Sequence, residues 1–379
     1  MSIKVCNRCV LDTTVPDLVF DKNRECNYCK IHDALEEQYP LGSYGRRVLL
    51  DEIRIVKEKG KSKKYDCVVG ISGGTDSTFV LYLAKVIFGL RPLAVHFDNG
   101  WNSEVAVRNV KNATDKLDVD LYTLVADWEQ FKDLQRSFFV ASVSDVDIST
   151  DYAIYSTLLS VASKFNIPSI LEGHSFRAEG TVPIGWTYMD GTYVNDVQDK
   201  YGTMKIDSFP IMTIFQLLYY LIWRRIKYVR PLEYLNFNKE KAKKLLIKEL
   251  DWEYSGGHHH ESTFTHFFQS YYLPNKFNID KRKVELSANI RSGYLEREKA
   301  LKELQEDYPY NQELVNYSIK KLDFSEEDFK NIMTSPNKKF TEFNTNIDKI
   351  KLLSIPIFLA TKLGILPTML YEKYAKFKK

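Results

Sequence analysis

Four of the five cysteines stand in two matched pairs, and this spacing is the sharpest chemical signal in the sequence. Cys6 and Cys9 form one Cys-x2-Cys pair, and Cys26 and Cys29 form a second after sixteen intervening residues. Such pairs turn four thiolates toward one point, which is the ligand set of a tetrahedral Zn²⁺ site. Two disulfides, a redox pair and an iron–sulfur cluster are the alternatives. Because four thiolates close a tetrahedral site, we expect a structural metal there and no chemistry.

A glycine-rich turn supplies the second signal. The sequence Ser-Gly-Gly-Thr-Asp-Ser at 72–77 follows an apolar, β-branched run at 65–71 and precedes an apolar run of helical spacing at 78–88. The glycines let a backbone approach an anion closely, and the following helix points its N–H groups at it. The lysine of the GxxxxGK[ST] phosphate loop is missing, so a site of that type is not supported. The pattern predicts a phosphate-binding loop, with a plain tight connection as the alternative.

The segment 72–77 after a strand resembles the SGGxDS loop of the PP-loop ATP pyrophosphatases. Members of this superfamily split ATP between the α and β phosphates and transfer AMP to an oxygen of the substrate. The resemblance implies ATP and Mg²⁺ as cofactors and catalytic roles for Asp76 and His174. The residues expected to bind the nucleotide lie in the loop and at the ends of two later strands: Ser72, Gly73, Gly74, Thr75, Asp76, Ser77, Phe97, Asp98 and Gly173.

Further motifs resemble a narrower group, the N-acetyl-sugar amidotransferases of lipopolysaccharide O-antigen and flagellar sugar biosynthesis. The paired cysteines, the loop, the segment 97–101 and the segment 256–262 follow one another in the family's order, and the similarity continues through 264–282. It covers nearly the whole chain. One position departs from the pattern, because His258 stands where a lysine is expected, so no role is assigned to it.

The resemblance points to four further site residues. His259 and Glu261 lie on the same side if their segment is extended, where a neutral histidine can orient a proton and a carboxylate can accept one. Both are therefore expected to be catalytic, although a solvated polar loop is the alternative for the histidine run. Lys276 and Arg282 are expected to bind the anionic nucleotide part of an activated sugar. Ordinary surface charge is the alternative for these two.

The elements that must position these residues indicate an α/β fold. We predict a Rossmann-like PP-loop sheet, of the adenine nucleotide alpha hydrolase-like type, because ligands of parallel sheets gather where the strands end. The predicted strands are 65–71, 91–98, 119–125 and 167–174. An N-terminal four-cysteine zinc ribbon and a mainly helical C-terminal region complete the chain, in which the basic run 239–244 is read as a solvated face. The predicted segments are 1–45 for the ribbon, 46–230 for the PP-loop ATP pyrophosphatase domain and 231–379 for the C-terminal substrate or partner region.

Composition narrows the function classes. The chain has 379 residues, 53 Lys+Arg against 50 Asp+Glu, and a net charge of +3, which leaves a weak electrostatic footprint for nucleic acid. The apolar segments 211–223 and 352–371 are too short or too interrupted to span a membrane, so we read both as buried or interfacial helices, with a peripheral membrane role as the alternative. We therefore expect a cytoplasmic protein with no nucleic acid partner and no transmembrane span.

The residues alone indicate an adenylating nucleotide enzyme, and the resemblance implies more. It implies an ATP-dependent amidotransferase that adenylates the acetamido oxygen of a nucleotide-activated N-acetyl sugar and replaces that oxygen with ammonia, giving an acetamidino sugar. Residue 2 is Ser and no cysteine follows Cys67, so no glutaminase nucleophile is visible. We therefore expect separate glutaminase and cyclase-like ammonia-channel subunits. The alternatives are a tRNA thiolase of the same superfamily and a non-catalytic nucleotide-binding zinc-ribbon scaffold.

Overall fold

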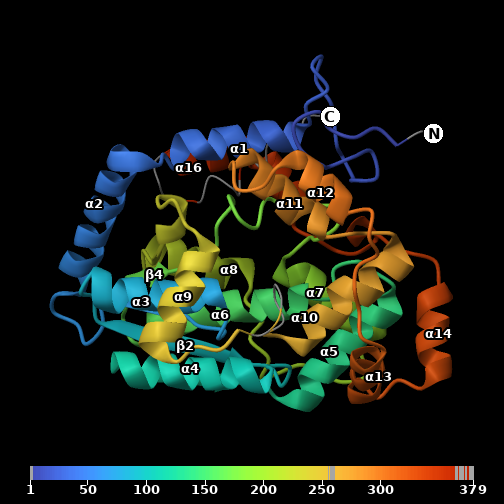
Figure 1. Ribbon diagram of the computed structural model, residues 1–379. Helices are drawn as coiled ribbons and strands as arrows, with labels where there is room; N and C mark the ends of the chain where they lie inside the picture. The colour runs from blue at the N-terminus through green and yellow to red at the C-terminus, as the bar shows by residue number, and fades with distance from the viewer. Residues whose placement is uncertain are drawn as a thin grey trace.

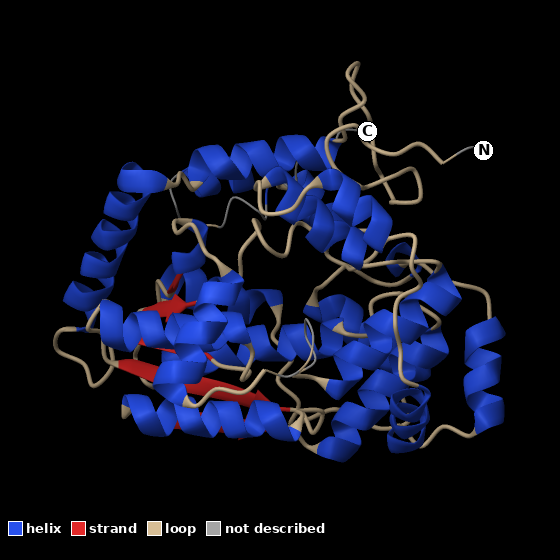
Figure 2. Ribbon diagram, viewed as in Figure 1, coloured by secondary structure: helices blue, strands red, loops and turns tan. Residues whose placement is uncertain are grey.

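A parallel five-stranded sheet organises one side of the molecule (Figure 2). The structure is a computed structural model that describes residues 3–254, 256, 261–362, 366, 371 and 374. All neighbouring strands pair in parallel, in the order β3-β2-β1-β4-β5. The strands are β1 (Cys67–Gly70), β2 (Pro92–Asp98), β3 (Leu121–Val125), β4 (Ser169–Leu171) and β5 (Lys227–Val229). The predicted parallel sheet is thus confirmed, with β5 as an additional strand that the sequence analysis did not predict.

Helices connect the strands and form most of the remaining chain (Figure 1). Up to the end of the sheet region they are α1 (Asn27–Gln38), α2 (Gly42–Gly60), α3 (Thr75–Tyr82), η1 (Leu83–Ile87), α4 (Glu104–Leu117), α5 (Trp128–Ala141), α6 (Ile148–Lys164), α7 (Gly191–Tyr201), α8 (Ile214–Leu218) and η2 (Tyr219–Trp223). The later ones are η3 (Pro231–Glu233), α9 (Lys239–Leu250), α10 (Thr263–Phe267), η4 (Phe268–Phe277), α11 (Arg282–Arg291), α12 (Arg297–Glu303), α13 (Gln312–Lys321), α14 (Glu326–Thr334), η5 (Phe340–Glu342), α15 (Ile347–Leu352) and α16 (Ser354–Lys362).

The central strand β1 shows why the sheet is buried on both faces. Its side chains alternate between two cores: Cys67 and Val69 pack with α2, α3, α4 and α9, whereas Val68 packs with α6 on the opposite face. A run of apolar residues without polar alternation is the pattern expected of such a doubly covered strand. Cys67 is fully buried, and burial raises the pKa of its thiol, so this cysteine is held in the unreactive protonated form.

The C-terminal helices share an aromatic core with the sheet region. Phe139 of α5 contacts rings from α10, η4 and the α13–α14 segment, at centroid distances from 4.6 to 6.4 Å. Edge-to-face ring contacts of this kind add specificity to apolar burial. The mainly helical character predicted for this region is confirmed. The α5 rings are part of its packing, so the core continues across the predicted boundary at 230.

The two long apolar segments, predicted to be buried or interfacial helices, are largely exposed rather than buried. No residue of α8 or η2 is fully buried, and Phe215 and Trp223 are each 80% exposed. In the second segment Leu352 is 84% and Ile355 is 71% exposed, and much of 363–371 lies outside the described residues. These helices are apolar around their whole circumference, so packing one side against the protein leaves an apolar side uncovered. In the described part of the chain no helix has both the length and the apolarity to cross a bilayer.

Candidate functional site

The segment 72–77 forms a closed turn between β1 and α3. The Ser72 backbone N–H donates to Ser77 Oγ at 3.2 Å, and the two serine hydroxyls are 3.1 Å apart. Gly74 is the N-cap of α3, and its N–H donates to Ser72 Oγ at 3.3 Å. The strand, turn and helix therefore follow one another as predicted, with the N-terminus of α3 at the turn. A helix N-terminus placed at such a turn can bind an anion, which fits the phosphates of ATP.

Gly73 fixes this loop to its surroundings. Its φ is +83°, and a methyl group at this position would lie 2.4 Å from the Ala106 carbonyl oxygen in α4. The Gly73 carbonyl accepts hydrogen bonds from Asn109 Nδ2 at 3.1 Å and from Trp252 Nε1 at 2.9 Å. Only glycine satisfies both the backbone conformation and the close approach. The loop is thus held from behind by α4 and by the segment after α9.

Two predicted nucleotide-binding positions lie at the ends of β2 and β4, the strands on either side of β1. Asp98 is the last residue of β2, and its Oδ1 accepts from the Gly100 N–H at 2.9 Å and from Asn102 Nδ2 at 3.0 Å. Gly173 follows β4, and a methyl group on it would lie 3.0 Å from the Asp76 backbone. Gly173 therefore packs against the first turn of α3, which brings the end of β4 to the loop. Phe97, beside Asp98, is buried.

Glu261 reaches the loop from the C-terminal region. The Ser103 N–H donates to the Glu261 carbonyl and the Thr263 N–H donates to the Trp101 carbonyl, both at 2.9 Å, so the two segments pair through the antiparallel bridge Asn102–Ser262. A methyl group on Gly74 would lie 3.0 Å from Glu261 Oε1, so this carboxylate is beside the loop. His259, the other residue predicted for this segment, lies outside the described residues.

Lys239 is a site residue that the sequence analysis missed. Its Nζ lies 3.5 Å from Asp76 Oδ2, at the first position of α9. Burial acts to lower the pKa of Lys239, but the carboxylates of Asp76, Glu285, Glu179 and Glu261 together raise it above its ordinary value. The solvated face predicted for 239–244 is therefore wrong for Lys239. Asn238, which caps α9 through its side chain, is the one local signal that the helix begins there.

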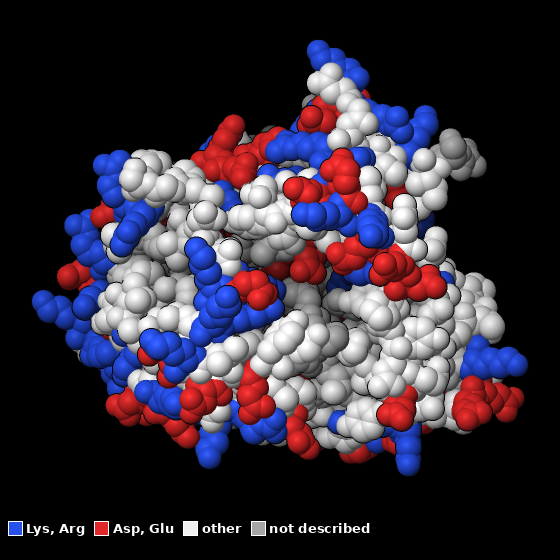
Figure 3. Space-filling view, viewed as in Figure 1, with Lys and Arg blue, Asp and Glu red and all other residues white. Residues whose placement is uncertain are grey.

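A second group of charges lies after β4 and β5. His174 Nδ1 and Glu179 form an ion pair, and Arg230 Nε donates to Glu172 Oε2 at 2.8 Å. The nearby Glu179 carboxylate is the main cause that raises the pKa of His174 to about 9. At neutral pH His174 is therefore a cation rather than a neutral base. Figure 3 shows this face hollowed between the upper helices α1 and α11 and the body that contains α9, with charged side chains along the rim.

Lys276 and Arg282, predicted to bind substrate, have structural partners instead. Lys276 Nζ donates to the Ile332 and Ser335 carbonyls at 2.5 and 2.9 Å, where η4 meets α14. Arg282 Nη2 donates to Asp280 Oδ2 at 2.7 Å, and its guanidinium also donates to two backbone carbonyls, one in the last residue of α12 and one just after this helix. These hydrogen bonds, in the described part of the chain, hold C-terminal segments together. The structure does not bring either side chain together with the phosphate loop, and a substrate-binding role stays a prediction.

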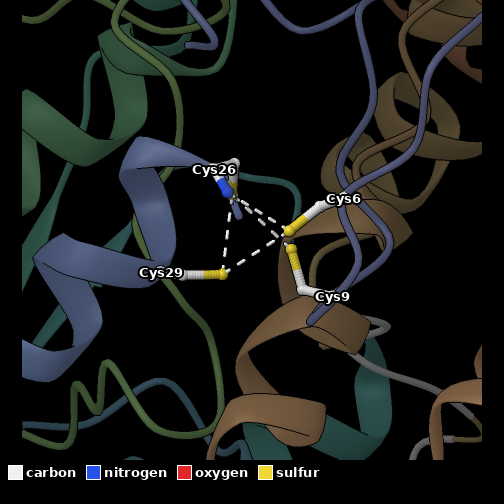
Figure 4. Close-up of side chains that lie close together, drawn as sticks. All are labelled: Cys6, Cys9, Cys26 and Cys29. Atoms are coloured by element: carbon white, nitrogen blue, oxygen red, sulfur yellow. Dashed lines mark hydrogen bonds between the residues drawn. The ribbon is translucent and has the colours of Figure 1, made fainter. Parts of the chain in front are cut away.

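The four paired cysteines form a closed centre (Figure 4). All four are fully buried, their Sγ atoms lie within 4.8 Å of one another, and three of the separations are 3.6, 3.7 and 3.8 Å. A tetrahedron with metal–sulfur bonds of about 2.3 Å has sulfur–sulfur edges of about 3.8 Å. The arrangement thus fits one tetrahedral metal ion. Cys26 caps α1, and the bridges Val5–Asp12 and Phe20–Cys26 form the short antiparallel turns of the N-terminal segment.

Arg291 of α11 joins this centre to the C-terminal region, and nothing in the spacing of the cysteines predicts it. Its Nε donates to Cys29 Sγ at 3.3 Å and its Nη2 to Cys9 Sγ at 3.2 Å. Burial acts to lower the pKa of Arg291, but the cysteine sulfurs raise it above its ordinary value. Arg297 adds hydrogen bonds to the Cys9 and Cys6 carbonyls at 3.1 and 2.8 Å. A divalent ion with four thiolates carries a net charge of −2, which a buried guanidinium partly balances.

Comparison with known proteins defines the class first. Residues 49–135, which contain the loop, match the family model of NAD synthase. Together with the parallel sheet, this match identifies a PP-loop nucleotide enzyme domain. Residues 261–354 match the C-terminal domain of the LPS biosynthesis protein WbpG-like family. The two matches confirm the predicted family and superfamily: the chain joins a PP-loop domain to a WbpG-like C-terminal domain, and Glu261 is the first residue of the second match.

Individual proteins that resemble this chain give weaker information about it than the two family matches. An uncharacterized protein of Methanocaldococcus jannaschii is 40% identical over 91 residues, which are 24% of this chain and 32% of that protein. The match thus spans about a third of that relative's length. NMN synthetase from Francisella tularensis is 14% identical with a TM-score of 0.36, over 82% of this chain and 99% of that one. The U34-tRNA thiolase NcsA from Methanococcus maripaludis is 15% identical with a TM-score of 0.34, over 84% and 97%. With TM-scores below 0.5, neither structure bears on activity.

Proposed function

We propose that this protein is an ATP-dependent amidotransferase that converts the acetamido group of a nucleotide-activated N-acetyl sugar into an acetamidino group. The observation that carries the proposal is the contact between the two matched domains at one point. The first residue of the WbpG-like domain, Glu261, presents its carboxylate beside Gly74 of the phosphate loop. A domain related to lipopolysaccharide biosynthesis thus contributes a side chain to the loop of an ATP-using domain.

The proposed reaction uses ATP because an amide carbonyl is a poor electrophile. The acetamido oxygen attacks the α-phosphorus, the bond to the β-phosphate breaks and pyrophosphate leaves. Ammonia then adds to the activated carbon, AMP leaves with the oxygen, and one proton is released as the acetamidine forms. The net reaction consumes one ATP and one ammonia and yields AMP and pyrophosphate. Mg²⁺ bound with ATP would balance phosphate charge, and the carboxylates of Asp76 and Glu261 are ligands of the kind it prefers.

The described residues suit separate parts of this reaction. The loop N–H groups and serine hydroxyls, with the cation of Lys239 opposite Asp76, can stabilise the departing pyrophosphate. Asp98 and Gly173 lie where the strands end, and there they can contact the adenosine part. Glu261 is a carboxylate that can accept the proton released as ammonia adds. His174, as a cation beside Glu179, suits charge balance better than proton abstraction.

Ammonia comes, in this proposal, from separate glutaminase and cyclase-like subunits. A glutaminase needs an accessible cysteine or similar nucleophile. All five cysteines of this chain are fully buried, four of them in the metal centre. The same observation disfavours the thiolase alternative, since no cysteine is available near the loop to carry sulfur. We also propose Zn²⁺ as the metal, because four buried thiolates at tetrahedral spacing form a structural zinc site of the usual kind.

The deciding experiment measures products. The purified chain is given ATP, Mg²⁺ and an ammonium salt, with a panel of UDP- and CMP-linked acetamido sugars, and AMP, pyrophosphate and the mass of the sugar are followed. We expect AMP and pyrophosphate only when sugar and ammonia are both present, with an amidine product 1 Da lighter than its acetamido precursor, about the difference between O and NH. Glutamine should replace ammonium only when a glutaminase is added. Turnover with tRNA and a sulfur donor instead would establish the thiolase, and nucleotide binding without turnover would establish the scaffold.

Glu261→Gln sharpens the test. It keeps the size of the side chain and the backbone pairing with 101–103, but removes the proton acceptor. We expect ATP binding to be retained and amidine formation to fall about 10²-fold or more, the usual size of a general base contribution. Glu253→Gln is the matched control, because this carboxylate lies before the same segment and pairs with Arg108 at 3.0 Å on the surface. Equal loss in both variants would contradict a catalytic role for Glu261.

A further inference from the structure

One helix on the surface is apolar on the side that faces solvent. The consecutive elements α8 and η2 cover Ile214–Trp223, and their inner side packs on the core that includes α6 through Leu217, Tyr220 and Leu221. Six large residues on the other side are exposed, by 39 to 80%, and we call them the outer stripe: Ile214, Phe215, Leu218, Tyr219, Ile222 and Trp223. From Phe215 onward they follow the i, i+3, i+4, i+7, i+8 spacing of one helix face.

The outer stripe is unusual for a protein surface. A surface helix normally turns polar side chains outward, and isolated exposed apolar residues need no explanation. Here the exposed residues are contiguous and include a tryptophan, a tyrosine and a phenylalanine. A contiguous apolar surface of this kind marks a place where something else binds. Trp and Tyr are also the residues enriched at the boundary between lipid and water, because their rings are apolar and their N–H or O–H groups are polar.

Positive charge continues from the end of this stripe. The segment 208–232 contains no Asp or Glu, and Arg224, Arg225 and Lys227 follow the stripe directly. Lys63 and Arg224 both donate to Asn166, at 2.6 Å to its carbonyl and 3.1 Å to its Oδ1, so the loop after α2 adds to the same place. We call Lys59, Lys63, Arg224, Arg225 and Lys227 the basic cluster.

The cations of the basic cluster are close enough to affect one another. Burial and then the charges of Lys227 and Arg225 lower the pKa of Lys59, and burial and then Arg224 lower the pKa of Lys63. Figure 3 shows Lys and Arg gathered along the edge of the molecule formed by α2 and the loop after it. Like charges brought together repel, and a negatively charged surface relieves that repulsion.

We propose that the outer stripe and the basic cluster form a docking surface for an anionic lipid bilayer. The stripe enters the boundary between headgroups and acyl chains, and the cations contact the anionic headgroups, as in other helices that lie in the membrane plane. A second copy of this chain fits less well, because a two-fold contact pairs the same patch with itself and brings like charges together. The protein is thus held at a membrane without a spanning helix.

Vesicle sedimentation with the full chain tests the proposal directly. We expect binding to phosphatidylcholine vesicles that contain phosphatidylglycerol, with affinity at least about 10-fold above that for phosphatidylcholine alone, and a marked loss at high salt, because the headgroup attraction is screened. No binding to the anionic vesicles at low salt would overturn the proposal.

Fluorescence identifies the docking residue. Trp101, Trp186 and Trp252 are buried and Trp128 is half-buried, whereas Trp223 is 80% exposed. We expect anionic vesicles to shift the emission to shorter wavelength in the parent protein. Trp223→Phe should abolish that shift while the protein still sediments with the vesicles, since phenylalanine also enters the boundary. A shift of full size in Trp223→Phe would place the contact elsewhere and contradict the proposal.

Paired variants separate the two parts of the surface. Ile222→Gln with Trp223→Gln, and Arg225→Gln with Lys227→Gln, should each reduce binding to anionic vesicles about 10-fold or more. Ile247→Gln is the control, because Ile247 is half exposed on α9, outside the surface. Thermal unfolding should be nearly unchanged in all three, since the altered side chains are exposed. Unaltered binding in the stripe variant would overturn the proposal. The proposal would also be overturned if no form of the protein bound vesicles and the stripe variant instead lost the ability to form a dimer or a complex with an added glutaminase. The outer stripe would then be a protein contact.

Discussion

The phosphate loop and the four-cysteine centre are both contacted by the C-terminal helical region, but in opposite ways. At the loop the region contributes a carboxylate, Glu261, to a half-buried site lined by charges of both signs. At the cysteine centre it contributes a cation, Arg291, to a fully buried site with no room for substrate. The contact at the loop suits a reaction during which charge develops and is transferred. The contact at the cysteine centre suits a permanent negative charge that one buried cation balances. In the proposed function, one region therefore serves activity at one point and stability at the other.

The largest expected effect is at the cysteine centre. Cys26→Ser removes one of four metal ligands, and because metal binding is coupled to folding we expect loss of the metal and a fall of about 4–5 kcal/mol or more in the free energy of unfolding. Metal content by elemental analysis and thermal unfolding check this. Cys67→Ala is the matched control, since Cys67 is equally buried but lies in β1, and it should keep the full metal content. If elemental analysis found iron and sulfide in the parent protein, the centre would be an iron–sulfur cluster and the proposal of zinc would be wrong.

At the loop, two adjacent glycines should behave differently. Gly73→Ala puts a methyl group against a backbone carbonyl at a positive φ, so we expect about 1–3 kcal/mol of destabilisation together with loss of ATP turnover. Gly74 has φ −74°, and the three atoms nearest to a methyl group there belong to the ends of the Glu261 and Ser72 side chains. Gly74→Ala should therefore unfold like the parent and still lose turnover. Pyrophosphate release and chemical denaturation measure the two effects, and equal stability of the two variants would count against the packing argument.

Arg291 tests whether the cation at the closed centre is needed. Arg291→Gln keeps part of the side chain but removes the charge and hydrogen bonds to Cys9 and Cys29, so we expect metal affinity to fall about 10–100-fold while the four ligands remain. Competition with a chromogenic chelator measures this without any activity assay. Lys299→Gln is the control, because Lys299 is 70% exposed on α12 and pairs with Glu296. A retained affinity in Arg291→Gln would show that the net charge of the centre is balanced elsewhere.

The residues that the sequence predicts are those whose partners are close in the chain. The paired cysteines and the 72–77 turn act through short spacings, and the strand ends bearing Asp98 and Gly173 follow from the alternation of strands and helices. Arg291 is 262 positions after Cys29, and no local pattern connects them. Lys239 begins a lysine-rich helix, and its neighbours in the sequence predict that its side chain is exposed to solvent. Family resemblance pointed to Glu261, but its place beside Gly74 depends on the pairing of 101–103 with 261–263.

The smallest expected effect concerns pH at the edge of the loop. The Glu179 carboxylate raises the pKa of His174 from 6.5 to about 9, against the opposing effects of burial and Arg230, with Glu172 as a further negative charge. The folded protein therefore holds this proton more tightly than the unfolded chain, and the contribution to stability is complete below pH 6.5 and is lost as pH rises through about 9.

Glu179→Gln removes the main cause of this shift, so the variant should lose less stability than the parent between pH 6.5 and 9. The side chain of His174 is 41% exposed, so solvent screens the pair and the difference between the two proteins should be small. Urea unfolding across this pH range measures it, and the titration of the His174 ring by NMR reports the pKa directly. Asp323→Asn, at an exposed carboxylate that pairs with Lys132, is the control and should leave that pKa unchanged. If His174 titrates near 6.5 in the parent, its ion pair with Glu179 contributes nothing, and His174 is a neutral imidazole at the pH where the loop binds ATP. The candidate site would then hold one cation fewer, and the contrast between a site of mixed charges and a centre balanced by one fixed cation would rest on Lys239 and Arg230.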